Sequence, residues 1–255
     1  MLPFLRRLTG DRRSADANRL LGLSLAFVAG AMNAGGFLAV DQYTSHMTGI
    51  VSSLADAVAL YDTAIALTAL GSIAAFVAGA AYSAILINWG RHHRTHSRYA
   101  YPLLWEAGLL LVFGLMGGTL ELKSGFVPLT VILLCFIMGL QNAIITKISN
   151  AEIRTTHMTG IVTDIGIELG KMVYVNSQEA SEHYQPVRTN WRRLGLLVSL
   201  LAAFFTGGVA GALGFKHVGY ASTLPLAALL VVLAVVPLMD DVRTRARLLK
   251  RGRRR

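Results

Sequence analysis

The chain has 255 residues, is 54% hydrophobic and carries a formal net charge of +10. This composition excludes an ordinary soluble domain and indicates a multi-pass membrane protein. The single cysteine, Cys135, excludes an intramolecular disulfide and a zinc site built from thiolates. The basic residues lie in the tails and short loops without interleaved aromatic side chains, so nucleic acid is not an expected partner.

Six apolar runs are each long enough to cross a hydrocarbon core about 30 Å thick, and each is expected to form a spanning helix. In chain order they cover residues 20–40, 63–88, 102–120, 128–148, 194–215 and 222–239. Residues 46–61 and 157–175 also have helical patterns, but they carry acidic side chains that are costly at the bilayer centre. The expected fold is therefore all-α, a polytopic membrane helix bundle of six spanning helices and two short motif helices.

Each short helix begins with the same hexapeptide, His-Met-Thr-Gly-Ile-Val, at residues 46–51 and 157–162. A pair of hydroxyl residues precedes each copy and is expected to cap the helix. Farther upstream, each copy follows a Gly and an Asn three residues apart, Gly30/Asn33 and Gly139/Asn142. These matches predict an internal duplication. The chain divides into a basic cytoplasmic N-tail (1–19), membrane repeat 1 (20–122), membrane repeat 2 (123–240) and a basic cytoplasmic C-tail (241–255).

Loop charge favours six crossings over eight. With a cytoplasmic N-terminus, six crossings keep nearly all Lys and Arg residues in the cytoplasm, including the polar insertion at 176–193. Eight crossings would instead place Arg91, Arg94 and Arg98 outside. Three spans per repeat make the second repeat inverted relative to the first, an architecture that recurs in transporters. Both termini are then cytoplasmic.

The starts of the two short helices are the candidate binding site. A helix N-terminus presents unpaired N–H groups and a partial positive charge, and the motif glycines allow a ligand or a backbone to approach closely. Two such starts facing each other would attract an anion. The candidate solute-binding residues are His46, Thr48, Gly49, His157, Thr159, Gly160, Asn33 and Asn142. Asp56, Asp164 and Glu168, farther along these helices, are candidates for coupling a proton or a cation.

The same residues have a structural interpretation, in which Ser and Thr cap helices, Gly serves packing and each His bonds a carbonyl of the other repeat. No nucleotide-binding Gly-rich loop, nucleophile elbow or His-Glu-x-x-His motif occurs, so neither an enzyme nor a cofactor is expected. His92, His93 and His96 cluster in a basic loop, where a solvated loop is favoured over a metal site. The basic tails favour contact with anionic lipid headgroups.

Residues 30–39, 43–49, 139–143 and 154–160 resemble the YoaK family of bacterial multi-pass membrane proteins. Many members carry an acidic residue where this chain has Asn33, and an Asn where it has Ile50. The resemblance covers nearly the whole chain except the tails. It implies a location in the bacterial inner membrane and supplies no substrate, because the family is a domain of unknown function.

Two functions are compatible with these features. The first is a secondary transporter or channel for a small solute, with an anion favoured, bound between the two helix starts. The alternative is a non-transporting membrane scaffold or sensor whose basic cytoplasmic tail recruits a partner. A polar cavity lined by both motifs would favour the transporter, and a close-packed centre would favour the scaffold. The expected partners are the lipid bilayer, the solute and anionic headgroups, and a homo-oligomer is compatible with either function.

Overall fold

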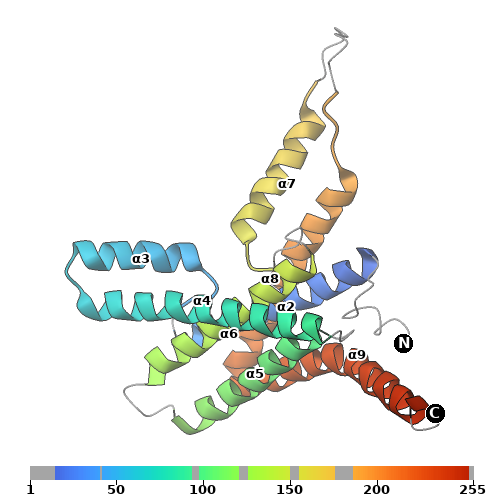
Figure 1. Cartoon of the computed structure of the whole chain (residues 1–255). Coiled ribbons are helices and arrows are strands. Elements are labelled where there is room, and N and C mark those ends of the chain that lie inside the picture. The colour runs from blue at the N-terminus through green and yellow to red at the C-terminus, as the bar shows by residue number, and fades with distance from the viewer. Residues whose placement is uncertain are drawn as a thin grey trace.

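The computed structural model describes residues 15–40, 42–93, 98–120, 126–149, 155–175 and 186–252. Within these ranges the chain is helical and has no strand, which confirms the all-α fold (Figure 1). The elements are α2 (Ala15–Val40), α3 (Met47–Ala59), α4 (Thr63–His92), α5 (Ala100–Leu120), α6 (Phe126–Ile148), α7 (Met158–Val173), α8 (Trp191–Val218), η1 (Gly219–Ser222) and α9 (Thr223–Gly252).

Each of the six predicted apolar runs coincides with a helix, and the two predicted motif helices are α3 and α7. Four apolar helical stretches of the described chain are long enough to cross a membrane: Asn18–Leu38, Thr63–His92, Leu129–Ile148 and Trp191–Val235. The last of them contains α8, η1 and the start of α9, whereas Ala100–Leu115 of α5 is a shorter apolar helix. Most of the predicted N-tail lies outside the described residues, and α9 continues as a helix into the predicted C-tail.

The most extensive helix pairing in the described bundle joins α2 to α8. Gly30 on α2 lies against the carbonyl oxygen of Phe204, and Gly207 on α8 lies against the carbonyl oxygen of Phe27. A methyl group on either glycine would collide with that oxygen. Only residues without a Cβ allow two helix backbones to approach this closely. Gly211, one turn after Gly207, extends the contact along the backbone of α2.

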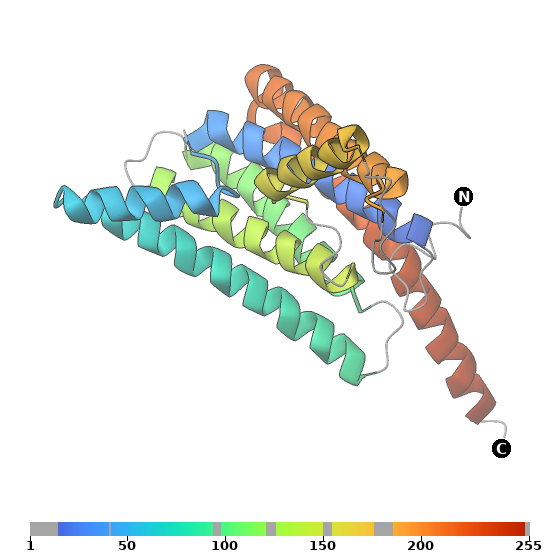
Figure 2. The same ribbon diagram turned by 90° about the horizontal axis from the view of Figure 1, so that it is seen from above.

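The same contact recurs between α4 and α6. Gly79 on α4 lies against the carbonyl oxygen of Phe136, and Gly139 on α6 lies against that of Phe76. All four helices therefore carry Phe-x-x-Gly where they cross, at residues 27–30, 76–79, 136–139 and 204–207. Each crossing pairs a helix from the first half of the chain with one from the second half (Figures 1 and 2).

The remaining core contacts set the direction of the helices. Gln141 Nε2 on α6 donates to the carbonyl oxygen of Leu25 at 3.1 Å, while Gly36 faces Leu134, so α2 and α6 run antiparallel. α5 and α9 also run antiparallel, because Gly117 near the end of α5 lies against the ring of Tyr220, just before α9 begins. The fully buried side chains gather on α2, α5, α6 and α9 around these contacts.

Two helical hairpins, α3–α4 and α7–α8, extend from this core (Figures 1 and 2). The long second helix of each hairpin begins with a side-chain cap. Asp62 Oδ1 accepts from the N–H of Ile65 at 3.0 Å, and Asn190 Oδ1 accepts from the N–H of Arg193 at 3.0 Å. The outward faces of α4 and α8 are apolar, with exposed side chains that include Leu70, Val77, Phe205 and Val209. An extended apolar surface of this kind fits contact with lipid.

Candidate functional site

The two copies of the hexapeptide start their helices with the same backbone geometry. His46 is the N-cap of α3 and His157 is the N-cap of α7, with φ, ψ of −88°, 67° and −86°, 58°. The first intrahelical bond of each runs from Ile50 N or Ile161 N to the histidine carbonyl oxygen, at 3.1 Å in both copies. Neither imidazole makes a capping hydrogen bond, so both rings are available for another role.

Each motif glycine makes room for the histidine of its own motif. A Cβ on Gly49 would meet Cδ2 and Nε2 of His46, and a Cβ on Gly160 would meet the same two atoms of His157. The sequence predicts close approach of a ligand or a backbone at these glycines. The neighbour found there is instead the imidazole ring, which folds back over the first turn of the helix. The glycine therefore determines where the ring lies.

Two asparagines hold the loops that lead into the motifs. Asn33 Oδ1 accepts from the backbone N–H of Ser45 at 3.2 Å and from its Oγ at 2.8 Å. Asn142 Oδ1 accepts from Thr156 Oγ1 at 2.5 Å. The predicted capping by the hydroxyl pair is therefore wrong, because Ser45 and Thr156 bond to the preceding helix and the histidine occupies the N-cap position. The asparagines connect α2 to α3 and α6 to α7 in the same way.

A cavity of about 520 Å³ opens beside the first motif. It lies between the end of α2, the following loop, α3 and the start of α4, and its walls mix polar and apolar side chains. The lining residues are Phe37, Gln42, Tyr43, His46, Gly49, Ile50, Ser53, Ala64, Ile65, Thr68 and Ala69. The volume falls within the range of about 300–1,000 Å³ that small-molecule sites occupy. Of the candidate solute-binding residues, His46 and Gly49 are in its lining.

The starts of α3 and α7 approach each other near the middle of the bundle in both views (Figures 1 and 2). His46 and His157, at these starts, both have exposed side chains, as do Thr48 and Thr159. Among the described residues that line the cavity, none belongs to the second motif. A single cavity shared by both histidines stays a prediction.

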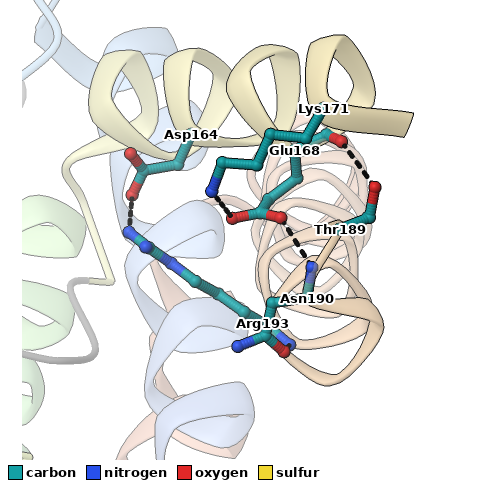
Figure 3. Close-up of polar contacts among 6 residues, drawn as sticks. All are labelled: Asp164, Glu168, Lys171, Thr189, Asn190 and Arg193. Carbon is teal, nitrogen blue, oxygen red and sulfur yellow. Dashed lines mark hydrogen bonds and ion pairs between the residues drawn. The ribbon is translucent and has the colours of Figure 1, made fainter. Parts of the chain in front are cut away.

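The acidic candidates on α7 are engaged in ion pairs. Asp164 Oδ2 lies 2.9 Å from Arg193 Nη2, and Glu168 Oε1 lies 2.8 Å from Lys171 Nζ (Figure 3). Glu168 Oε2 also accepts from the backbone N–H of Asn190 at 2.8 Å. The contacts with Arg193 and Asn190 fasten α7 to the start of α8, while Lys171 pairs with Glu168 within α7; we call this set of contacts the α7–α8 clasp. Asp56 occupies an exposed position on α3.

The surroundings of Glu168 favour its ionised form. The hydrogen bond from Lys171 and the backbone N–H of Asn190 lower the pKa of the Glu168 carboxyl, because both stabilise the carboxylate. Its side chain is only 2% exposed, and α7 lies outside the apolar stretches long enough to cross a membrane. A paired carboxylate of this kind holds two helices together and remains ionised near neutral pH.

The partners in this clasp carry no recognisable motif. Asn190 and Arg193 belong to the segment that the sequence marks only as a polar insertion. The spacing of Asn190 before an apolar run is a helix-start signal, and it would have located α8 but not its contacts with α7. The histidine cluster of the basic loop is described only at His92 and His93, because His96 lies outside the described residues. No group of metal-ligating side chains occurs in the described part of the chain.

Comparison with known proteins gives one family. The family model described as "Protein of unknown function (DUF1275)" matches residues 21–236. The chain is also 25% identical, over 169 residues, to the UPF0700 transmembrane protein YoaK of Bacillus subtilis (strain 168). That match covers 65% of this chain and 73% of the relative. No solved structure gives a significant match. The family match includes both hexapeptides and both helix crossings.

Proposed function

This chain belongs to the DUF1275 family, and from that premise we propose that it is a secondary transporter or channel for a small solute. The resemblance to the YoaK family is confirmed, and the chain is a membrane protein. The family supplies no substrate. The function must therefore be argued from the residues of the chain itself.

The architecture that we propose is a pair of inverted repeats, α2–α5 and α6–α9. Support comes from contacts that recur at corresponding positions. The Phe-x-x-Gly crossings, the Asn-to-hydroxyl bonds before each motif and the capped starts of α4 and α8 each occur twice. The corresponding helices α2 and α6 run antiparallel, as do α5 and α9, which is the relation that inversion requires.

In this architecture α2, α4, α5, α6, α8 and α9 cross a bacterial inner membrane, and α3 and α7 enter without crossing. Both termini are then cytoplasmic, together with the loop after α4. Labelling of a single cysteine, His93→Cys on a Cys135→Ala background, tests this arrangement in intact cells. A membrane-impermeant thiol reagent should leave it unlabelled until the cells are opened. Labelling from outside would contradict three crossings per repeat.

The solute is expected to bind at the start of α3. If the start of α7 also contributes residues, both motifs form one shared site. The observation that carries this proposal is the cavity beside the first motif, with His46 in its lining and a helix N-terminus at its edge. Exposed N–H groups and the positive end of the helix dipole favour an anion there. An imidazole ring adds a hydrogen-bond donor that can also accept a proton. Asn33 and Asn142 hold the two helix starts in place.

The contacts of Asp164 and Glu168 favour a structural role over ion coupling. Each is already paired with a cation, and together they hold the α7–α8 hairpin. Removing the charge from either residue should therefore weaken the attachment of α7 to α8 and leave the ratio of ion to solute transported unchanged. The exposed Asp56 remains a coupling candidate by its position on α3 alone.

Uptake into proteoliposomes tests the transport function. Purified protein is screened against small anions, neutral solutes and cations, and the hit is measured for His46→Ala, His157→Ala and the double variant. Both histidines should matter, and the double loss should be less than additive because both act on one site. His217→Ala, an exposed histidine at the end of α8, is the matched control and should keep wild-type uptake.

Absence of uptake for every class of solute would favour the alternative, a membrane scaffold or sensor. The close backbone packing at the two Phe-x-x-Gly crossings is the observation that supports this alternative, because a rigid centre suits a platform. Its basic tail would then recruit the partner. Capture of a partner that depends on residues 241–255, by a protein that moves no solute, would establish the scaffold.

A further inference from the structure

An acidic side chain lies inside the bundle without a hydrogen-bond partner among the described residues. Glu106 on α5 is 0% exposed, and within the described chain neither Oε1 nor Oε2 has a hydrogen-bond donor. It is the acidic residue of an otherwise apolar run, Ala100–Leu115. Its surroundings therefore differ from those of Glu168, whose two carboxylate oxygens are both satisfied.

Physical chemistry limits the state that such a side chain can adopt. An ionised carboxylate without a counter-charge or hydrogen-bond donors is very costly in an apolar interior, and the group takes up a proton instead. Ionisable residues in membrane helices are costly to insert, and they commonly mark proton relays or ion pathways. A neutral carboxyl at Glu106 would carry one O–H donor, which requires an acceptor.

An acceptor with no donor in the described part of the chain lies at about the same level of the bundle. Tyr99 Oη, just before α5, donates to the carbonyl oxygen of Lys147 at 3.4 Å, which sets the register of the antiparallel α5 and α6. Because the helices are antiparallel, a step of seven residues forward from Tyr99 along α5 corresponds to a step of seven residues back from Lys147 along α6. Glu106 therefore lies at about the level of residues 140–141 of α6. Gln141 is fully buried, its Nε2 donates to Leu25, and its Oε1 has no donor within the described chain.

No other titratable group of the described residues forms a hydrogen bond with this carboxyl. The elements packed against α5 are α4, α6, η1 and α9. Tyr82 of α4 packs its ring on Trp105, and Tyr220 of η1 packs its ring on Phe113. The other groups are the buried Cys135 and, near the ends of the helices, Arg91, His92, His93, Arg98 and Lys147. On α9, the described side chains from Thr223 to Val235 include no titratable group.

We propose that Glu106 is a proton-binding site within the membrane bundle, with Gln141 as the acceptor for its proton. We further assign to it the coupling proton of the transporter, a role that rests on the function proposed above. Binding adds a proton to the carboxylate and release removes it, and no other bond changes. Release requires that water or a donor reach the carboxyl, so the proton can leave only when the bundle opens beside α5.

Infrared difference spectroscopy tests the proton-binding site without any assumption about transport. The wild-type spectrum minus that of Glu106→Gln, recorded near neutral pH in lipid, should show the C=O band of a protonated carboxyl. Glu106→Asp, which keeps the acid, should retain such a band at a shifted position. Carboxylate bands in place of the protonated band would overturn the proposal. Gel filtration of each variant checks that it is folded, since Gln preserves the size of the side chain.

Transport measurements test the coupling role separately. With a pH gradient across the proteoliposome, wild-type protein should accumulate the solute, while Glu106→Gln should exchange it without accumulation. Accumulation by Glu106→Gln equal to that of wild type would overturn the coupling role and leave the transport function standing. If wild-type protein moves no solute, transport and coupling fall together. The infrared result then decides the proton-binding site alone.

Discussion

Replacement of a crossing glycine by alanine should separate the cost of helix contact from ordinary helix propensity. Gly207 and Gly195 both lie on α8, and they differ in what a methyl group would meet. At Gly207 it would collide with the carbonyl oxygen of Phe27, whereas at Gly195 nothing lies within 4 Å. The two variants therefore form a matched pair on one helix.

The expected magnitude follows from two opposing effects. Alanine in place of glycine favours a helix by about 1 kcal/mol, and this gain applies equally at both sites. A methyl group forced against a backbone carbonyl cannot be relieved by a rotamer change, so α2 and α8 must move apart, at a cost of about 1–3 kcal/mol typical of overpacking. Gly195→Ala should raise the free energy of unfolding slightly. The free energy of unfolding of Gly207→Ala should be lower than that of Gly195→Ala by about 1–3 kcal/mol.

Unfolding in detergent micelles, followed by the loss of helical circular dichroism, measures this difference. Gly30→Ala adds a methyl group to the facing helix at the same crossing, and the double variant should cost less than the sum because the helices are already apart. Gly139→Ala should match Gly207→Ala if the two crossings are equivalent. Equal stability of Gly207→Ala and Gly195→Ala would refute the close backbone contact between α2 and α8.

Three further predictions concern the motif helices. Gly49→Ala should keep the protein folded but displace the His46 ring, because the ring can rotate away from the new methyl group; transport should fall as it does in His46→Ala. Tyr61, at φ 59° in the turn after α3, adopts a left-handed conformation that glycine accommodates without strain. Tyr61→Gly should raise the free energy of unfolding by about 1 kcal/mol, seen as a higher midpoint in a thermal melt. The lowered pKa of Glu168 means that the α7–α8 clasp stabilises fully above the usual value of 4.5 and weakens as the pH falls through the lower folded value. With Trp89 and Trp105 replaced by Phe, the fluorescence of Trp191 should change over that acid range when Glu168 is present and stay flat in Glu168→Gln.

The sequence predicts the helices well because their signals are local. Apolar length located all six long helices, and the repeated hexapeptide located α3 and α7. The pairing of helices was not predictable in the same way. Phe76 and Phe204 share their spacing to a glycine with Phe27 and Phe136, but nothing local states which helices will cross. That choice depends on how whole helix faces fit across the two halves of the chain.

The candidate site shows the same limit at the level of single side chains. The hydroxyl residues before each motif have good capping propensity, yet Asn33 competes for Ser45 and the histidine becomes the N-cap. Propensity describes the isolated helix start and omits a partner from the preceding helix. Sequence reasoning missed Glu106, because an acid within an apolar run is a weak signal and its lack of a partner among the described residues is visible only once its neighbours are in place.

The pairing of α2 with α8 has a consequence for how the chain is made. During translation α2 leaves the ribosome first among the described helices, but its partner follows only after α3 to α7 have been synthesised. The pair α4 and α6 can close much earlier. Until α8 arrives, the glycine face of α2 is open to lipid or to the α8 of a neighbouring copy, which would exchange helices between two molecules. A nascent chain interrupted before Trp191 thus holds one of its two central crossings and leaves the other unmade.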